Sequence, residues 1–152
     1  MIINKIRADH VIDFAAEELK KYLRMMMPES PEIDIVYNPD AKNGFRLGLL
    51  SDFSLDTSEA SDLRLDDIVH IDTDNNGGII AGSNMRSVLF AVYRFLYENG
   101  CRWLYPGIDG EHIPVREIGP VYYHKMADNR FRGFCNEGGE SQQCMIETID
   151  FC

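Results

Sequence analysis

The spacing of apolar residues changes several times along the chain, and each change predicts an element. Residues 2–6, with isoleucine at positions 2, 3 and 6, have the composition of a short strand. From Asp9 the apolar positions recur at helical spacing as far as Met26, which predicts a helix. Asp9 is placed to cap this helix and Pro28 to end it. The run Met25–Met27 at its end is expected to fill gaps in the core.

Several strands are predicted in the middle of the chain. Residues 33–37 and 45–50 have strand-like composition and are separated by turn residues. The polar stretch 51–65 is typical of a loop with a short helix. Residues 68–71 and 79–81 flank the sequence Asp-Asn-Asn-Gly-Gly, in which Asn and Gly tolerate positive φ. A β-hairpin is therefore expected there.

A second helical pattern follows, which Ser83 or Asn84 can cap and which Gly100 is placed to end in the left-handed conformation. Its predicted inward face consists of Met85, Val88, Leu89, Val92, Phe95 and Leu96. Short strands are expected near residues 101–105 and 121–123. This order of elements predicts an α/β (α+β) fold, in which one mixed β-sheet is covered by two long helices.

The last part of the chain has a different pattern. Residues 130–135 are strand-like, and a helical pattern that Ser141 can cap follows at Met145, Ile149 and Cys152. This pattern ends without a Gly, a Pro or a basic last turn, so we expect the helix to be cut short. We therefore expect two domains, residues 1–125 and residues 126–152, of which the second is only the start of a larger unit.

Charge and hydropathy exclude several classes of partner. The 152 residues carry 25 acidic and 15 basic side chains, a net charge of −10, and no basic stripe that could neutralise phosphates. Nucleic acid is therefore not expected as a partner. The first residues lack the apolar core of a signal peptide, and Arg94 interrupts the most apolar stretch, residues 88–96. We expect a cytoplasmic protein that does not contact a membrane.

The cysteines and acidic residues indicate no metal site. The cysteines are Cys101, Cys135, Cys144 and Cys152. They form no C-x-x-C pair and match no zinc spacing, so free thiols are expected. Residues 72–77 match the first half of a calcium loop, but Ser83 stands where that loop needs a bidentate Glu, which favours a hairpin turn. No metal and no cofactor are expected.

Two acids near a Gly-Gly pair, Glu137 and Glu140, are the residues that most suggest catalysis. Glycoside hydrolysis needs two carboxyl groups that lie about 5–10 Å apart across the sugar. Two acids on one short loop are more typical of a solvated surface or a helix cap. No Ser/His/Asp or Cys/His arrangement follows from the order of the residues.

Three sequence patterns occur in a fixed order along the chain. They are A-A-x-E-L-x-x-Y-L over residues 15–23, A-G-x-N-x-R-x-x-L-x-A-V-Y-x-F-L over residues 81–96, and G-C-R-W over residues 100–103. Together they resemble the N-terminal α/β domain that precedes the catalytic (β/α)8 barrel in family 67 α-glucuronidases, family 20 β-N-acetylhexosaminidases and related glycoside hydrolases. The resemblance covers about residues 2–115 and implies a domain like the second domain of the hexosaminidases.

Residues 129–134 then resemble the first barrel strand of those enzymes, and the helical pattern after them resembles the first barrel helix. The resemblance implies that Arg132 hydrogen-bonds sugar hydroxyls and that Glu137 occupies the position of a nearby acid, so both are candidate substrate-binding residues. The planar guanidinium of Arg132 suits such a role because it can hold two vicinal hydroxyls. The catalytic carboxylates of these families lie on later strands that the 152 residues do not include.

These observations predict a non-catalytic N-terminal domain of a glycoside hydrolase in carbohydrate metabolism. Its expected partner is the missing barrel of the same polypeptide, and residues 1–152 alone are expected to be inactive because a barrel active site is assembled from several strands. One alternative is a stand-alone module that binds a carbohydrate or a protein around Trp103 and Tyr105. Another is a small thiol-dependent enzyme that uses Cys135.

Overall fold

The computed structural model describes residues 1–131 and Ile146. The predicted strand over residues 130–135 therefore lies almost wholly outside the described residues, and Arg130 and Phe131, its first two positions, belong to no strand. The helical pattern predicted after Ser141 is likewise outside them, except for Ile146. Among the described residues, neither long helix combines the length and the apolar character needed to cross a bilayer.

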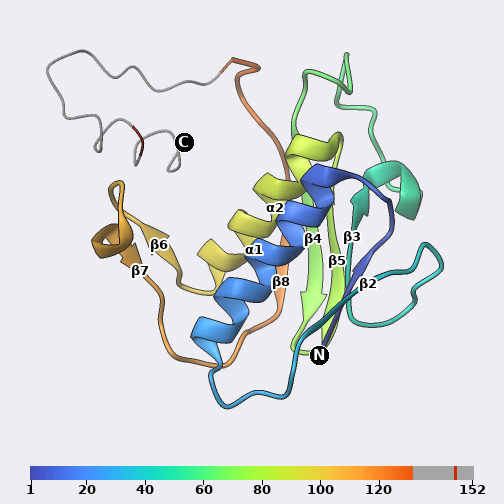
Figure 1. The fold of residues 1–152 in the computed structure, drawn as a ribbon. Coiled ribbons are helices and arrows are strands. Elements are labelled where there is room, and N and C mark those ends of the chain that lie inside the picture. The colour runs from blue at the N-terminus through green and yellow to red at the C-terminus, as the bar shows by residue number, and fades with distance from the viewer. Residues whose placement is uncertain (132–145, 147–152) are drawn as a thin grey trace, which may run out of the picture.

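The main sheet has six strands in the order β2-β1-β3-β5-β4-β8 (Figure 1). The strands are β1 (Ile2–Lys5), β2 (Asp34–Tyr37), β3 (Phe45–Leu49), β4 (Ile68–Asp74), β5 (Gly77–Gly82) and β8 (Val121–Met126). β1 pairs in parallel with both β2 and β3, and β3 pairs in parallel with β5. β4 runs antiparallel to β5 and to β8, so the predicted mixed sheet is confirmed.

The two helices lie side by side on one face of this sheet (Figure 1). They are α1 (His10–Met26) and α2 (Met85–Glu98). Asp9 caps α1, as predicted, by accepting a hydrogen bond from the amide of Val11, and Asn84 caps α2 by accepting from the amide of Ser87. Gly100 follows α2 with φ +100°, a conformation that L side chains rarely adopt.

The core lies between the helices and the sheet. The apolar positions predicted from the helical periodicity face it, and Val88, Val92, Phe95 and Leu96 are fully buried. Leu89 and Met85 are only partly buried and pack against its edge. Met26 and Met27 are buried as expected, whereas the prediction for Met25 is wrong. Met25 is 41% exposed because it lies on the outer face of α1, about one-quarter turn from Met26.

A different structure covers the opposite face of the sheet. Residues 50–67 cross it as the 3-10 helix η1 (Leu50–Phe53) followed by an irregular segment, which confirms the predicted loop with a short helix. Leu50, Ile68 and Ala81 form a second, small buried cluster beneath this segment. The cluster is separated from the main core by the sheet, because alternate residues of a strand point to opposite faces.

The predicted hairpin joins β4 and β5 through Asn75 and Asn76. The carboxylate of Asp74 accepts hydrogen bonds from the amides of Asn76 and Gly77, so the half calcium loop is a turn, as expected.

A small ribbon of β6 (Arg102–Trp103) and β7 (Glu111–His112) packs beside the helices, with the 3-10 helix η2 (Ile108–Gly110) between its strands. The short strand predicted near residues 101–105 is confirmed as β6, whereas β7 was not predicted.

Candidate functional site

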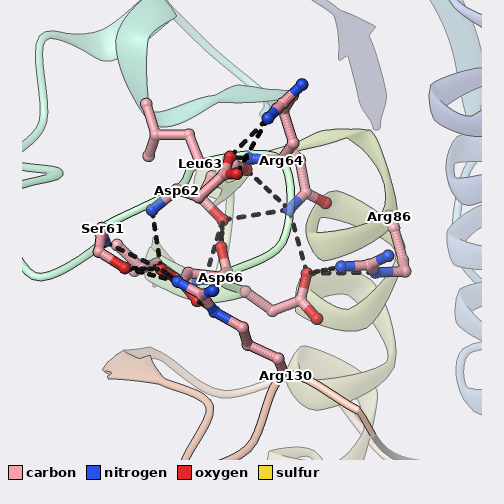
Figure 2. Close-up of polar contacts among 11 residues, drawn as sticks. Ser61, Asp62, Leu63, Arg64, Asp66, Arg86 and Arg130 are labelled. Atoms are coloured by element: carbon pink, nitrogen blue, oxygen red, sulfur yellow. Dashed lines mark hydrogen bonds and ion pairs between the residues drawn. The ribbon is translucent and has the colours of Figure 1, made fainter.

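A group of paired charges, whose two carboxylates are buried, lies where the described chain leaves the sheet. It consists of Asp66 and Asp67, directly before β4, together with Arg86 from α2 and Arg130 from the segment after β8. Figure 2 shows Asp66, Arg86 and Arg130 of this group. We call these four residues the junction cluster. Two carboxylates and two guanidinium groups from three distant parts of the chain are thus brought together at one end of the sheet.

Asp67 connects β4 to the start of α2. Its residue is only 2% exposed, and one carboxylate oxygen accepts hydrogen bonds from the Ser87 hydroxyl at 2.7 Å and the Asn84 amide at 3.1 Å. The same oxygen accepts from the Arg86 guanidinium at 2.8 Å. A buried carboxylate is stable only with such partners, since an unpaired buried charge is strongly unfavourable.

Asp66 connects the loop before β4 to the segment after β8. Its carboxylate accepts hydrogen bonds from the amides of Ser61 and Asp62, each at 2.9 Å. It also pairs with the Arg130 guanidinium through Nε and one terminal nitrogen (Figure 2). These bonds, that with Arg130 above all, hold the pKa of Asp66 well below its usual range. The exit of the chain is thereby attached to the loop on the far face of the sheet.

A shallow groove of about 350 Å³ lies beside the junction cluster, between α2 and β8. Its floor includes Val69, Phe90 and Tyr123, and its rim carries the charged side chains of Arg94 and Lys125. The Arg94 guanidinium stacks over the Tyr123 ring at 4.2 Å. Among the residues described, no three His, Cys, Asp or Glu side chains lie close enough together to hold a metal ion.

A second hollow, of about 450 Å³, lies at the carboxyl end of β1. Arg7 lines it, but the guanidinium of Arg7 is paired with both carboxylate oxygens of Asp52 at 2.8 and 2.9 Å. Asp52 in turn accepts a hydrogen bond from the amide of Leu49. The ion pair between Arg7 and Asp52 therefore holds η1 close to the segment that precedes α1.

The A-G-x-N-x-R pattern builds the junction cluster. A Cβ on Gly82 would lie 2.5 Å from the Ser87 side chain, so glycine allows α2 to approach the end of β5 closely. Asn84 caps α2 and donates to Asp67, and Arg86 pairs with Asp67. Each distinctive residue of this pattern thus has a contact within the domain.

The G-C-R-W pattern also makes internal contacts. Gly100 provides the turn after α2, and Cys101 is fully buried. Burial raises the pKa of the Cys101 thiol to about 11, so it is not a reactive thiol at neutral pH. Arg102 lies 3.7 Å above the Tyr97 ring and donates to the carbonyls of Tyr97 and Cys101.

Trp103 belongs to an aromatic cluster between the helices and the ribbon. Its ring packs edge-on against Tyr22 and Tyr93, and its Nε1 donates to the Tyr22 hydroxyl at 3.0 Å. The Tyr22 hydroxyl donates to Glu111, and the Tyr93 hydroxyl donates to Glu18. Burial raises the pKa of both tyrosines, so both stay neutral donors. Trp103, one of the two aromatic residues of the alternative binding surface, therefore packs and hydrogen-bonds within the domain. The other, Tyr105, is 52% exposed.

The predicted substrate-binding residues, Arg132 and Glu137, lie outside the described residues. Glu140 and Cys135 also lie outside them. The junction cluster was not predicted from the sequence. A pair of acids directly before a strand was its only local signal, and the sequence order did not reveal that Arg130 contacts Asp66.

A scan against protein-family models finds no match for this chain, and a search of curated proteins also finds no significant match.

Proposed function

We propose that residues 1–125 are a non-catalytic N-terminal accessory domain of a glycoside hydrolase and that the catalytic barrel of the same polypeptide begins within residues 126–152. In this proposal the domain supports the barrel and fixes the direction in which the chain enters it. Arg132 and Glu137 then belong to the first barrel strand and the loop after it, where they bind the sugar.

The observation that carries the proposal is the use of the three sequence patterns within the domain. Ala15, Leu19 and Leu23 of the first pattern are fully buried, and Tyr22 belongs to the aromatic cluster. The second pattern builds the junction cluster, and the third turns the chain after α2. Residues that serve folding in this way are expected of a supporting domain and not of a catalytic cleft.

The attachment of Arg130 is the second line of support. Arg130 stands two residues before Arg132, and its ion pair with Asp66 fixes the point where the chain leaves the sheet. An accessory domain needs a defined exit of this kind if it is to hold the following domain in one orientation, because otherwise the domains move freely about their linker.

Hydrolysis of a panel of aryl glycosides, including glucuronides and N-acetylglucosaminides, tests the proposal. Residues 1–152 should be inactive, and the polypeptide extended through the downstream reading frame should be active. In the extended polypeptide, Arg132→Gln should raise KM, since a guanidinium that binds sugar hydroxyls is lost. Arg64→Gln is the matched control, because Arg64 is an exposed arginine of the accessory domain and lies outside the proposed barrel strand.

Activity of residues 1–152 alone would contradict the proposal. So would an inactive extended polypeptide, or specific sugar binding by residues 1–131 that calorimetry detects and that Tyr105→Ala abolishes. The last result would favour the stand-alone module.

A further inference from the structure

Two histidines face each other across the strand pair β4–β8. His70 of β4 and His124 of β8 are direct partners in the register, and their Nδ1 atoms lie 3.1 Å apart. Their ring centroids are 5.3 Å apart, with the rings steeply inclined to each other. A distance of 3.1 Å between two ring nitrogens is a hydrogen-bond distance. The two rings therefore form a side-chain bond between β4 and the edge strand β8.

Only one proton fits between these two nitrogens. In the neutral pair, one ring donates its Nδ1–H and the other accepts with the lone pair of Nδ1. One added proton keeps this bond, since an imidazolium can donate to the remaining neutral ring. A second added proton must occupy the accepting Nδ1, which leaves two N–H groups and two positive charges pointing at each other. The contact cannot persist in that state.

The surroundings of the two rings differ. Glu59, from the segment that covers this face, lies 3.9 Å from Nε2 of His124, so a carboxylate faces a positive charge placed on that ring. His70 is 7% exposed, and burial, with His124 beside it, lowers the pKa of His70. The second proton must therefore enter the less accessible ring.

Two further carboxylates, those of Asp72 and Asp56, act on the pair. Asp72, on the same strand as His70, acts to raise its proton affinity, but this effect is smaller than that of burial. Asp56, on the covering segment, interacts electrostatically with His124. The neighbour of His70 on β5 is Ala81, and the nearest ring on β8 besides His124 is Tyr122.

We propose that His70 and His124 form a proton-sensitive clasp that holds β8 in the sheet at neutral pH and releases it when a second proton enters the pair. In the described part of the sheet β8 is the edge strand and pairs with β4, and the chain runs from it directly to Arg130. Release of the clasp therefore loosens the segment that leads out of the domain. This inference does not depend on the proposed glycosidase function.

The direction of the pH effect follows from His70. Its pKa in the folded state lies below the ordinary value of about 6.5, so the unfolded chain binds more protons at mildly acidic pH. The contribution of the pair to stability is thus fully present above about pH 6.5 and decreases as the pH falls through the folded-state pKa.

Hydrogen exchange of the β8 amides tests the clasp. After correction for intrinsic exchange, protection of β8 should fall about fivefold more than that of β1 between about pH 7.5 and pH 5. In His70→Gln, whose amide can still bond to His124 but does not titrate, the extra loss should disappear. His10→Gln is the matched control, since His10 is fully exposed at its side chain, and it should behave as the wild type.

An equal loss of β8 protection in the wild type and His70→Gln would overturn the proposal. If His70→Gln does not fold, nitrogen NMR of the wild-type imidazoles decides the matter. The clasp requires one ring to carry its proton on Nδ1 and the two rings to titrate in separate steps. Two rings that titrate independently of each other would also overturn it.

Discussion

The two faces of the sheet are held in different ways. On one face, α1 and α2 bury a large apolar core that includes Phe45 and Phe95, whose rings lie 5.4 Å apart. On the other face, the irregular segment 50–67 covers a small apolar cluster and is fixed mainly by polar contacts, among them those of Asp66. The helix face is therefore stabilised by burial, and the far face by specific hydrogen bonds and ion pairs.

The two faces therefore have different roles: one stabilises the fold, and the other connects distant segments of the chain. Apolar burial is non-directional and holds the two helices on the sheet. The polar contacts of the far face are directional and join segments that are distant in the sequence, including Asp66 and Arg130. The helix face thus maintains the fold, and the far face determines where the chain leaves it.

The largest effect is expected from a cavity in the helix-face core. Phe95→Ala should lower the free energy of unfolding by about 3–5 kcal/mol, because the ring is fully buried. Leu50→Ala, in the small cluster of the far face, should cost about 2–3 kcal/mol, at the lower end of the range for large-to-small changes. Denaturant unfolding measures both variants, and a larger loss for Leu50→Ala would reverse the assignment of roles to the two faces.

A smaller loss of stability is expected from the carboxylate that fixes the start of α2. Asp67→Ala should cost about 1–3 kcal/mol, since the buried hydroxyl of Ser87 and the half-exposed guanidinium of Arg86 both lose their acceptor. The control is Asp72→Ala on β4, the strand that follows Asp67, where the residue is exposed. Equal midpoints of urea unfolding for the two variants would show that the hydrogen bonds of Asp67 do not contribute to the stability of the folded state.

The ion pair of Arg130 with Asp66 should slow proteolysis of the chain at Arg130. Asp66→Asn should accelerate cleavage by trypsin after Arg130, because the neutral amide cannot form the ion pair and the exit segment opens more often. The matched control is Asp62→Asn. It removes one charge from the same loop, but the ion pair that it breaks is the one with Arg64. Mass spectrometry of the early fragments identifies the cleaved bond, and equal rates for the two variants would contradict the attachment.

The pH dependence of this attachment has a definite sign. Because the folded state holds the pKa of Asp66 below its unfolded value of about 3.9, the pair contributes fully above that value. Its contribution is lost as the pH falls below about 3.9 toward the folded-state pKa. The wild type should therefore lose protection at Arg130 in strong acid, whereas the clasp of His70 and His124 responds nearer neutrality.

The smallest effect is expected at the buried thiol. Cys101 has its pKa raised to about 11 by burial, so iodoacetamide near pH 8 should leave it unmodified in the folded protein. It should react once urea unfolds the chain. Rapid native labelling of Cys101, seen by peptide mass spectrometry, would show that the space between α1 and α2 is open to reagents.

The helix face could be predicted from the sequence almost completely. The apolar period of α1 and α2, the caps at Asp9 and Asn84 and the turn at Gly100 are local features, and local features are readable from a single chain. The order of the strands could not be predicted. It depends on which edges pair, and the hydrophobic pattern of a strand is the same for different neighbours.

The junction cluster and the clasp could not be predicted for a related reason. Asp66 and Arg130 are 64 positions apart, and His70 and His124 are 54 apart, so only the pairing of β4 with β8 brings them together. The sequence shows which residues can form charged or hydrogen-bonded pairs. It does not show which pairs the topology selects.

The reading frame downstream of codon 152 tests the proposed function most directly. We predict that it continues into strand–helix repeats that complete a (β/α)8 barrel, with two acidic residues at the carboxyl ends of later strands to act on the glycosidic bond. A stop codon immediately after Cys152, or a continuation without such repeats, would contradict the assignment of this chain to a glycoside hydrolase.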